Sequence, residues 1–442
     1  MADFTWTQHP DAEAVVNDLI AGALDESATL RSLDARLQQD TSTILFNWLD
    51  HVGGPVSAER LRDVGYVEGW QTEPGIWRHP HAQLPAVIPS EQRVLALRVD
   101  DVAAFMHVWN PRAVIDGTPL SGFRRVVVSN EDVIIAGVER RSWSDGINPV
   151  VFDDAKVLAS VRAWRLWSER PRPNVAGSEA IAAIGETTEV ATHMVELVGR
   201  DLAASYVLEI ERLYWQQRNT AGVIQHARQD RLGLGWGNND HHTFRSSRSG
   251  FRSLVGMFNV LGFENRERFY AGEQAGWGAQ VLEHPGCGGV LFTDVDLGPD
   301  EVGMDFSSTT LVESEHYGTV GMWCALHGES ILSAGMHHLE GQFAFDDLRD
   351  DLRAYGIEHM KPFSDFSHLR QAFTAAEKWP VASDRLRALV AAGHLQPDKA
   401  AEFAQLGVAG SHLENLQRRE GFKGFNQHSV SNTMRVTDPR TL

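Results

Sequence analysis

The hydrophobic pattern of the chain begins with a helical stretch. Across residues 10–40, apolar side chains such as Val15, Leu19 and Leu33 recur at helical spacing, with acidic residues between them. Spacing of this kind is typical of an amphipathic helix. We therefore expect residues 1–40 to form a helical leader.

Residues 41–150 change to short apolar runs separated by turn-forming residues. A helix-like segment follows the first of these runs, and three further runs rich in Val, Ile and Leu predict strands. Asn130, Glu131 and Asp132 stand where a hairpin turn is needed between the last two strands. The order β-α-β-β-β indicates one βαβββ module. The strand-like runs cover residues 43–46, 93–99, 124–129 and 133–139.

The rest of the chain repeats this alternation. Residues 151–235 have long stretches without Gly or Pro and strong helical periodicity, so they predict a helical connector. Residues 236–342 again give a strand, a helix and three strands, and then a hairpin over 318–338, which predicts a second βαβββ module. Residues 343–442 predict a largely helical C-terminal region. The expected fold class is α+β, with duplicated βαβββ modules flanked by helical segments.

Internal echoes support the duplication. Residues 130–139 resemble residues 328–337, and each stretch has an Ala-Gly pair shortly before a residue type that can bind a metal. His79 and His284, each before a proline, indicate a repeated turn rather than a pair of ligands. Similar short segments separated by a nearly constant number of residues are typical of a degenerate duplication. Such a duplication would place a cleft between the two copies. Other matches are Gly65-Tyr66 with Gly262-Phe263 and Trp77 with Trp277.

Composition and charge exclude some classes of binding partner and favour one cellular location. The balance of 40 Lys+Arg against 59 Asp+Glu gives a formal net charge of −19, which opposes binding to nucleic acid or to an anionic membrane surface. Two cysteines exclude a disulfide framework and favour a reducing, cytoplasmic location. We find no pattern typical of a signal peptide or a membrane span. The sequence gives no indication of oligomeric state.

Four equivalent positions of the two modules include candidate metal ligands. His241 and His337 lie on the first and last strands of the second module, and the internal repeat aligns them with Thr43 and Glu139 in the first. Two imidazoles and one carboxylate, with the remaining coordination positions open, are typical of non-haem Fe(II) oxygenases. We therefore predict a metal site formed by His241, His337 and Glu139 in the cleft between the modules. The expected cofactor is Fe(II), and another divalent metal is the alternative.

Strand alternation adds a candidate for substrate binding. His241, Thr243 and Arg245 fall on one face of their strand, so the Arg245 side chain is expected in the same cavity as the metal. A guanidinium there can hold a substrate carboxylate through paired hydrogen bonds. We predict that Arg245 belongs to the catalytic site.

The run Asp-His-His-Thr-Phe-Arg at 240–245, followed by a helix and Gly262-Phe263, resembles the vicinal-oxygen-chelate superfamily, whose paired βαβββ modules surround a metal. More narrowly, Asp-His-x-x-Phe-Arg resembles the 2-oxoadipate dioxygenase/decarboxylase family. The resemblance implies that His241 binds iron and that Arg245 contacts the substrate. The segment 418–426 is similar to the C-terminal region of that family, more weakly.

The same resemblance leaves the other ligands open. That family takes its second His and its Glu from the module after the Asp-His-x-x-Phe-Arg strand, which would make His359 the second imidazole. The internal repeat favours His337 instead. His338 is a further alternative, because a register slip of one residue exchanges the two faces of a strand.

These observations together predict a function. We expect a non-haem Fe(II)-dependent dioxygenase that acts with O₂ on a small 2-oxo or 2-hydroxy acid, with oxidative decarboxylation as the reaction that the resemblance implies. One alternative is a metal-dependent isomerase, lyase or hydrolase on the same fold. Another is a metal-free protein that binds a small ligand between the modules.

Overall fold

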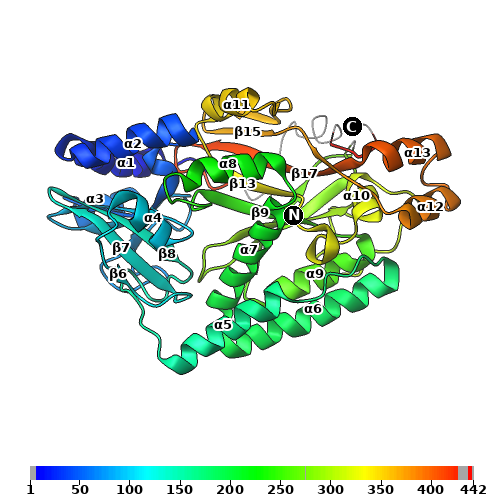
Figure 1. Ribbon diagram of the computed structural model, residues 1–442, viewed down its shortest axis with the longest axis horizontal. Coiled ribbons are helices and arrows are strands. Elements are labelled where there is room, and N and C mark those ends of the chain that lie inside the picture. The colour runs from blue at the N-terminus through cyan, green and yellow to red at the C-terminus, as the bar shows by residue number, and fades with distance from the viewer. Residues whose placement is uncertain (1–5, 274, 427–436, 441–442) are drawn as a thin grey trace.

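The computed structural model describes residues 6–273, 275–426 and 437–440 of the 442-residue chain. Two curled β-sheets lie side by side and helices cover them from outside (Figure 1). The first sheet lies in the blue and cyan part of the chain, and the second lies in the green-to-red part. No helix in these described residues is long and apolar enough to cross a membrane.

The first sheet contains two βαβββ modules. Its strands lie in the order β2-β3-β4-β1-β5-β8-β7-β6, so β1 and β5 meet at the centre and each begins a module. The first module is β1 (Leu49–Gly54), α3 (Ala58–Asp63), β2 (Val67–Glu68), β3 (Trp77–Arg78) and β4 (Ala86–Pro89). The second is β5 (Arg93–Arg98), α4 (Val102–Trp109), β6 (Ile115–Asp116), β7 (Phe123–Asn130) and β8 (Val133–Arg140).

The second sheet repeats this topology. Its order is β10-β11-β12-β9-β13-β17-β15-β14, with β16 (Glu377–Trp379) added against β17. Its first module is β9 (Asn239–Arg245), α9 (Arg248–Val260), β10 (Glu264–Tyr270), β11 (Trp277–Glu283) and β12 (Val290–Asp296). Its second is β13 (His338–Gln342), α11 (Phe345–Ala354), β14 (Ser364–Phe366), β15 (Leu369–Phe373) and β17 (Val408–Arg418). The duplication predicted from the sequence is confirmed, but it occurs at two levels. Residues 41–150 contain two βαβββ modules where one was expected, and the strand expected at 43–46 is absent, because β1 begins at Leu49.

The connector helices support the second sheet from one side. Their apolar faces join those of α9 and the sheet in one large buried cluster that includes Trp167, Tyr206, Trp236 and Phe244. Figure 1 shows α6 lying along α9, and α5 packs against α6. The helices of this connector are α5 (Asp154–Ser168), α6 (Gly177–Val198), α7 (Arg200–Gln216) and α8 (Thr220–Asp230). The expected helical leader is present as α1 (Pro10–Glu26) and α2 (Ala28–Thr41), followed by the 3₁₀ turn η1 (Leu45–Trp48).

Two further expectations from the sequence are wrong. Residues 318–338 do not form a hairpin; they form α10 (Thr319–His327) and the π-helical turn η2 (Ser330–Ala334). The Asp296 carboxylate accepts hydrogen bonds from the backbone N–H groups of Gly318, Val320 and Gly321, and this cap comes from a distant strand. Residues 343–442 are also not mainly helical. They complete the second sheet, and only α11, α12 (Ser383–Ala391) and α13 (Pro397–Leu406) are α-helices there among the described residues.

Candidate metal centre

Strand β9 brings alternate side chains to one pocket. His241, Thr243 and Arg245 all line it, as strand alternation predicts. The strand is buried along nearly its whole length. The neighbouring Asp240 forms a bidentate ion pair with Arg418 of β17, with N–O distances of 3.1 Å. This pair joins β9 to β17 across the intervening strand β13.

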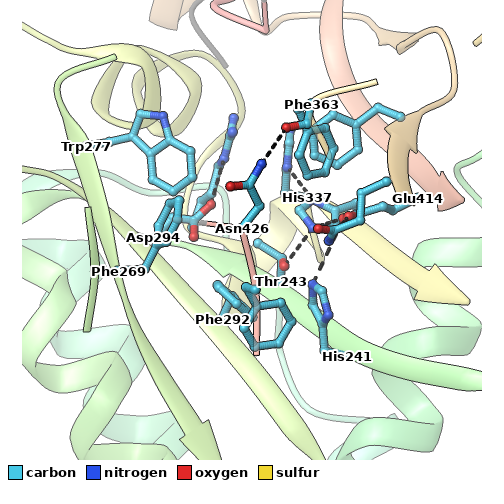
Figure 2. A pocket seen from close by; sticks show the side chains of 15 residues that line it. His241, Thr243, Phe269, Trp277, Phe292, Asp294, His337, Phe363, Glu414 and Asn426 are labelled. Carbon is cyan, nitrogen blue, oxygen red and sulfur yellow. Dashed lines mark hydrogen bonds and ion pairs between the residues drawn. The ribbon is translucent and has the colours of Figure 1, made fainter. Parts of the chain in front are cut away.

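Three potential ligands converge on this side of the sheet. The His338 Nε2 atom lies 3.0 Å from Oε2 of Glu414, and the His241 Nε2 atom lies 4.0 Å from the same oxygen. One ligand atom from each of these residues falls within 4.8 Å of the others. They come from β9, β13 and β17, three adjacent strands at the centre of the second sheet. Figure 2 shows His241 and Glu414 at the same end of the pocket.

The other nitrogen of each imidazole is already engaged. The His241 Nδ1 atom contacts Oε2 of Glu340 and lies 3.5 Å from the Asp240 carboxylate. The His338 Nδ1 atom lies 2.9 Å from Nδ1 of His337. Metal-binding histidines typically use their second nitrogen in this way, which fixes the ring orientation and directs Nε2 toward the ion. The His338 Nε2 atom also lies 2.8 Å from the Thr243 hydroxyl oxygen.

A glutamine links the two buried glutamates. The Gln371 Nε2 atom donates hydrogen bonds to Glu340 and to Glu414, each at 3.0 Å. Both glutamates are almost inaccessible to solvent. The carboxylate of Glu414 is therefore fixed in place next to the two imidazoles.

The electrostatics of the cluster suit a cation. Burial lowers the pKa of His241 and, more strongly, that of His338, so both imidazoles are neutral near pH 7 and their lone pairs are available. Burial raises the pKa of Glu414, and burial together with the charges of Glu414 and Asp240 raises the pKa of Glu340 well above its usual range. A divalent ion would supply the positive charge that these buried carboxylates lack. The donor set of two imidazoles and one carboxylate therefore fits a divalent metal of the first transition row.

Aromatic rings form most of the remaining pocket wall (Figure 2). The cavity volume of this pocket is about 50 Å³. The Phe292 ring lies 4.6 Å from the His241 ring, between centroids, and restricts water near that ligand. The aromatic lining residues are Phe269, Trp277, Phe292, Phe363, Phe373 and Phe425.

Arg245 and Asp294 lie at the pocket together. The Arg245 Nε atom is 3.6 Å from Oδ2 of Asp294, too far for a hydrogen bond. Within the described residues, the Arg245 Nε and Nη1 atoms and the Asp294 Oδ1 atom are buried without a hydrogen-bond partner. Burial raises the pKa of Asp294 to about 7. This part of the pocket thus offers two free donors and one free acceptor to a ligand.

The structure brings only part of the predicted metal site together. His241 and Arg245 line the pocket as expected. His337 also lines it, but the imidazole that meets His241 and Glu414 belongs to its neighbour His338, the alternative register. His359 is not among the pocket residues.

Glu139 does not contribute to this site. The expectation of a metal site in the cleft between the two halves is wrong, because the three potential ligands all lie on the second sheet. Glu139 is on β8 of the first sheet, where its carboxylate accepts hydrogen bonds from Arg124, Arg141 and the backbone N–H of Val102. These three contacts satisfy both of its oxygens. The alignment with His337 failed because residues 130–139 form a strand, whereas residues 328–337 form the turn after α10.

Sequence reasoning missed Glu414 altogether. Its strand, β17, lies in the region expected to be helical. Local pattern gives little signal for this strand, because Ser411 and Asn415 flank His412, Leu413 and Glu414 and break the alternation of polar and apolar residues.

The strand order defines the fold class. Two pairs of βαβββ modules, each pair closing around a shared face, are the vicinal-oxygen-chelate fold that the sequence resembles. No family model matches the chain, and no curated protein matches it.

Several solved structures are similar to this chain. A mutant of 4-hydroxymandelate synthase from Streptomyces coelicolor is 12% identical, covers 88% of this chain and 98% of its own, and has a TM-score of 0.27. A variant of methylmalonyl-CoA epimerase from the same species is 17% identical over 41% of this chain and 96% of its own, with a TM-score of 0.22. The Mn(II)-bound glyoxalase from Novosphingobium aromaticivorans is 11% identical over 84% of this chain and 82% of its own, with a TM-score of 0.20. Likeness at this level carries no argument about function, which is argued from the site.

Proposed function

We propose that the protein is a metal-dependent enzyme, specifically a non-haem Fe(II) dioxygenase that acts on a small 2-oxo or 2-hydroxy acid. One observation carries the proposal: the Nε2 atoms of His241 and His338 and a carboxylate oxygen of Glu414 converge at the wall of a pocket. Two His and one carboxylate leave coordination positions open for substrate and O₂. Bound there, iron would supply the redox chemistry that a reaction with O₂ requires.

The residues of the chain have distinct tasks in this proposal. His241, His338 and Glu414 hold the ion, and Glu340 and Gln371 keep two of these side chains oriented. The aromatic wall excludes water from the reacting centre.

Arg245 orients the substrate. Its free Nε and Nη1 donors can hold a carboxylate at the end of the substrate away from the metal. A buried guanidinium whose Nε and Nη1 atoms lack hydrogen bonds, and whose carboxylate partner Asp294 lies 3.6 Å away, favours an anionic ligand at this position.

The experiment is a reconstitution under anaerobic conditions. Purified protein is stripped of metal and loaded with Fe(II), Mn(II) or Zn(II). It is then transferred to air-saturated buffer with a panel of 2-oxo and 2-hydroxy acids, and O₂ consumption and CO₂ release are measured. We expect O₂ uptake with Fe(II) only, and its loss in Glu414→Ala. His51→Ala, which removes a buried imidazole from the first sheet, is the matched control and should retain activity.

Other outcomes would replace the proposal. Turnover of the same acids without O₂, or full activity with Zn(II), would make the protein an isomerase, lyase or hydrolase that uses the ion as a Lewis acid. Ligand binding that needs no metal and survives His241→Ala would make it a binding protein.

A further inference from the structure

A second cavity lies where the two halves of the chain meet. Residues of both halves line it, from Phe46 to Trp143 on one side and from Gly237 to Lys423 on the other. It is distinct from the metal pocket, because the two share none of their lining residues. Its lining is mostly polar, unlike the aromatic wall of the metal pocket.

The charges around this cavity do not balance. Among its described lining residues, four are basic, namely Arg78, Arg98, Arg140 and Lys423, and two are acidic, Asp50 and Glu283. Burial lowers the pKa of His79, which also lines it, to about 4, so this histidine is neutral near pH 7. A surplus of positive charge in an enclosed space is unexpected in a chain whose formal net charge is −19.

Both acidic residues are already paired. Asp50 forms a bidentate ion pair with Arg140 at 2.6 and 2.7 Å. Glu283 pairs with Lys423 at 2.7 Å and with Arg266 at 3.2 Å. Arg78 and Arg98 are therefore the uncompensated charges.

Hydrogen-bond donors of three residues at the cavity have no partner among the described residues. The Nη1 atom of Arg78 and the Nδ2 atom of Asn47 are buried without a hydrogen bond to any described residue. The Arg98 side chain likewise makes no hydrogen bond or ion pair within the described ranges, and burial and the charge of Arg212 lower its pKa. Arg78 stacks on Trp143, with its Cζ atom 4.3 Å from the ring centroid, while Arg140 approaches the same ring at 3.6 Å.

Two partly buried like charges and two buried unsatisfied donors favour an acceptor that joins them. We propose that this cavity binds a small multivalent oxyanion, a phosphate-bearing or polycarboxylate compound. Guanidinium groups bind such oxygens in pairs, and an anion of two negative charges offsets the two uncompensated arginines. Asn47 supplies a neutral donor that also favours oxygen.

Binding of the anion would join the two halves. Arg78, Arg98 and Asn47 belong to the first half, whereas Lys423 and Gln342 on the opposite wall belong to the second. A ligand that binds only the folded chain raises its stability by mass action. Trp143 lies next to the proposed anion and reports its arrival by fluorescence.

The test titrates the full chain, without added metal, with inorganic phosphate, pyrophosphate and citrate. Calorimetry and tryptophan fluorescence measure binding, and thermal unfolding measures stabilisation. We expect at least one of these anions to bind at one site per chain and to raise the melting temperature. Tighter binding of phosphate or pyrophosphate would indicate a phosphate-bearing ligand, and tighter binding of citrate would indicate a polycarboxylate.

Variants locate the site. Arg98→Gln should weaken binding at least tenfold, whereas Arg112→Gln, which removes the same charge from an exposed loop, should leave it unchanged. Asn47→Asp replaces the free donor with a charged oxygen of the same size and should abolish binding by repulsion. If Arg98→Gln does not fold, anion binding by Asn47→Asp tests the proposal. Absence of binding by the unmodified chain, or equal binding by Asn47→Asp and Arg112→Gln, would overturn the proposal, whatever the outcome at the metal centre.

Discussion

The two sheets share a topology but differ at one set of positions. In the second sheet Thr243 of β9 lies opposite His338 of β13, and in the first Gly53 of β1 lies opposite Val94 of β5. Glu414 is aligned with Glu340 on β13, and Ala136 is aligned with Ala96 on β5. By this register, His241, His338 and Glu414 correspond to His51, Val94 and Ala136.

A buried ion pair, in contrast, occurs in both halves. Asp240 pairs with Arg418, and at the equivalent positions Asp50 pairs with Arg140. The pair in each sheet joins the first strand of the first module to the last strand of the second. Its presence in both halves assigns it to the fold, whereas the ligand set occurs in one half only and is assigned to chemistry.

The largest expected effect concerns metal retention. Glu414→Ala and His338→Ala each remove one of three ligands, so elemental analysis should show a fall from about one ion per chain to almost none. His51→Ala should retain the ion, because Val94 and Ala136 beside it offer no ligand. Equal metal content in all three variants would contradict the assignment of the metal site to the second sheet.

Removal of the shared ion pair should affect stability next. Asp50→Ala leaves Arg140 buried without its carboxylate, and the free energy of unfolding should fall by about 3–5 kcal/mol. Metal content of the folded protein should not change. Denaturant unfolding measures the effect, and Asp116→Ala, at a more exposed pair with Arg125, should cost less than about 1 kcal/mol. Similar losses in both variants would contradict a structural role for the buried pair.

Arg245→Met should affect substrate recognition alone. Loss of its charge-assisted hydrogen bonds should reduce kcat/KM by about 10–100-fold, equivalent to about 1.5–3 kcal/mol, while metal content stays at the level of the unmodified protein. Steady-state kinetics with substrates that have or lack a second carboxylate provide the measurement. A loss of the same size for both substrates would argue against a carboxylate contact.

The smallest expected effect is a pH dependence. Burial raises the pKa of Asp294 to about 7, although Arg245 opposes the shift, so this acid is protonated below pH 7 and ionised above it. Ionised Asp294 competes with a substrate carboxylate for Arg245. Affinity should therefore be highest below pH 7 and fall by about tenfold per pH unit above it. Calorimetric titration across this range should show the fall in the unmodified protein, and a flat profile in Asp294→Asn.

Local sequence patterns predicted much of the fold. The helical leader, the connector and the hairpin of β7 and β8 follow from periodicity and turn residues that act over short distances. The His79 and His284 echo is a genuine repeat, since their Nε2 atoms contact the backbone carbonyls of Val64 and Leu261 at 3.2 and 3.1 Å.

The metal site was harder to predict from local sequence patterns. His241 and Arg245 could be predicted because one short motif places them on one face of a strand. Glu414 could not, because its position beside His241 depends on how β13 and β17 pair with β9. Register between distant strands is a property of the folded sheet, and a one-residue difference separates His337 from His338.

The location of the ion tests the central claim most directly. Crystals of the Fe(II)-loaded protein would show its position in an anomalous difference map. We predict one peak about 2 Å from Nε2 of His241, Nε2 of His338 and the carboxylate of Glu414. A peak beside His51 or Glu139 in the first sheet, or no peak at the three ligands in a sample that contains stoichiometric iron, would contradict it.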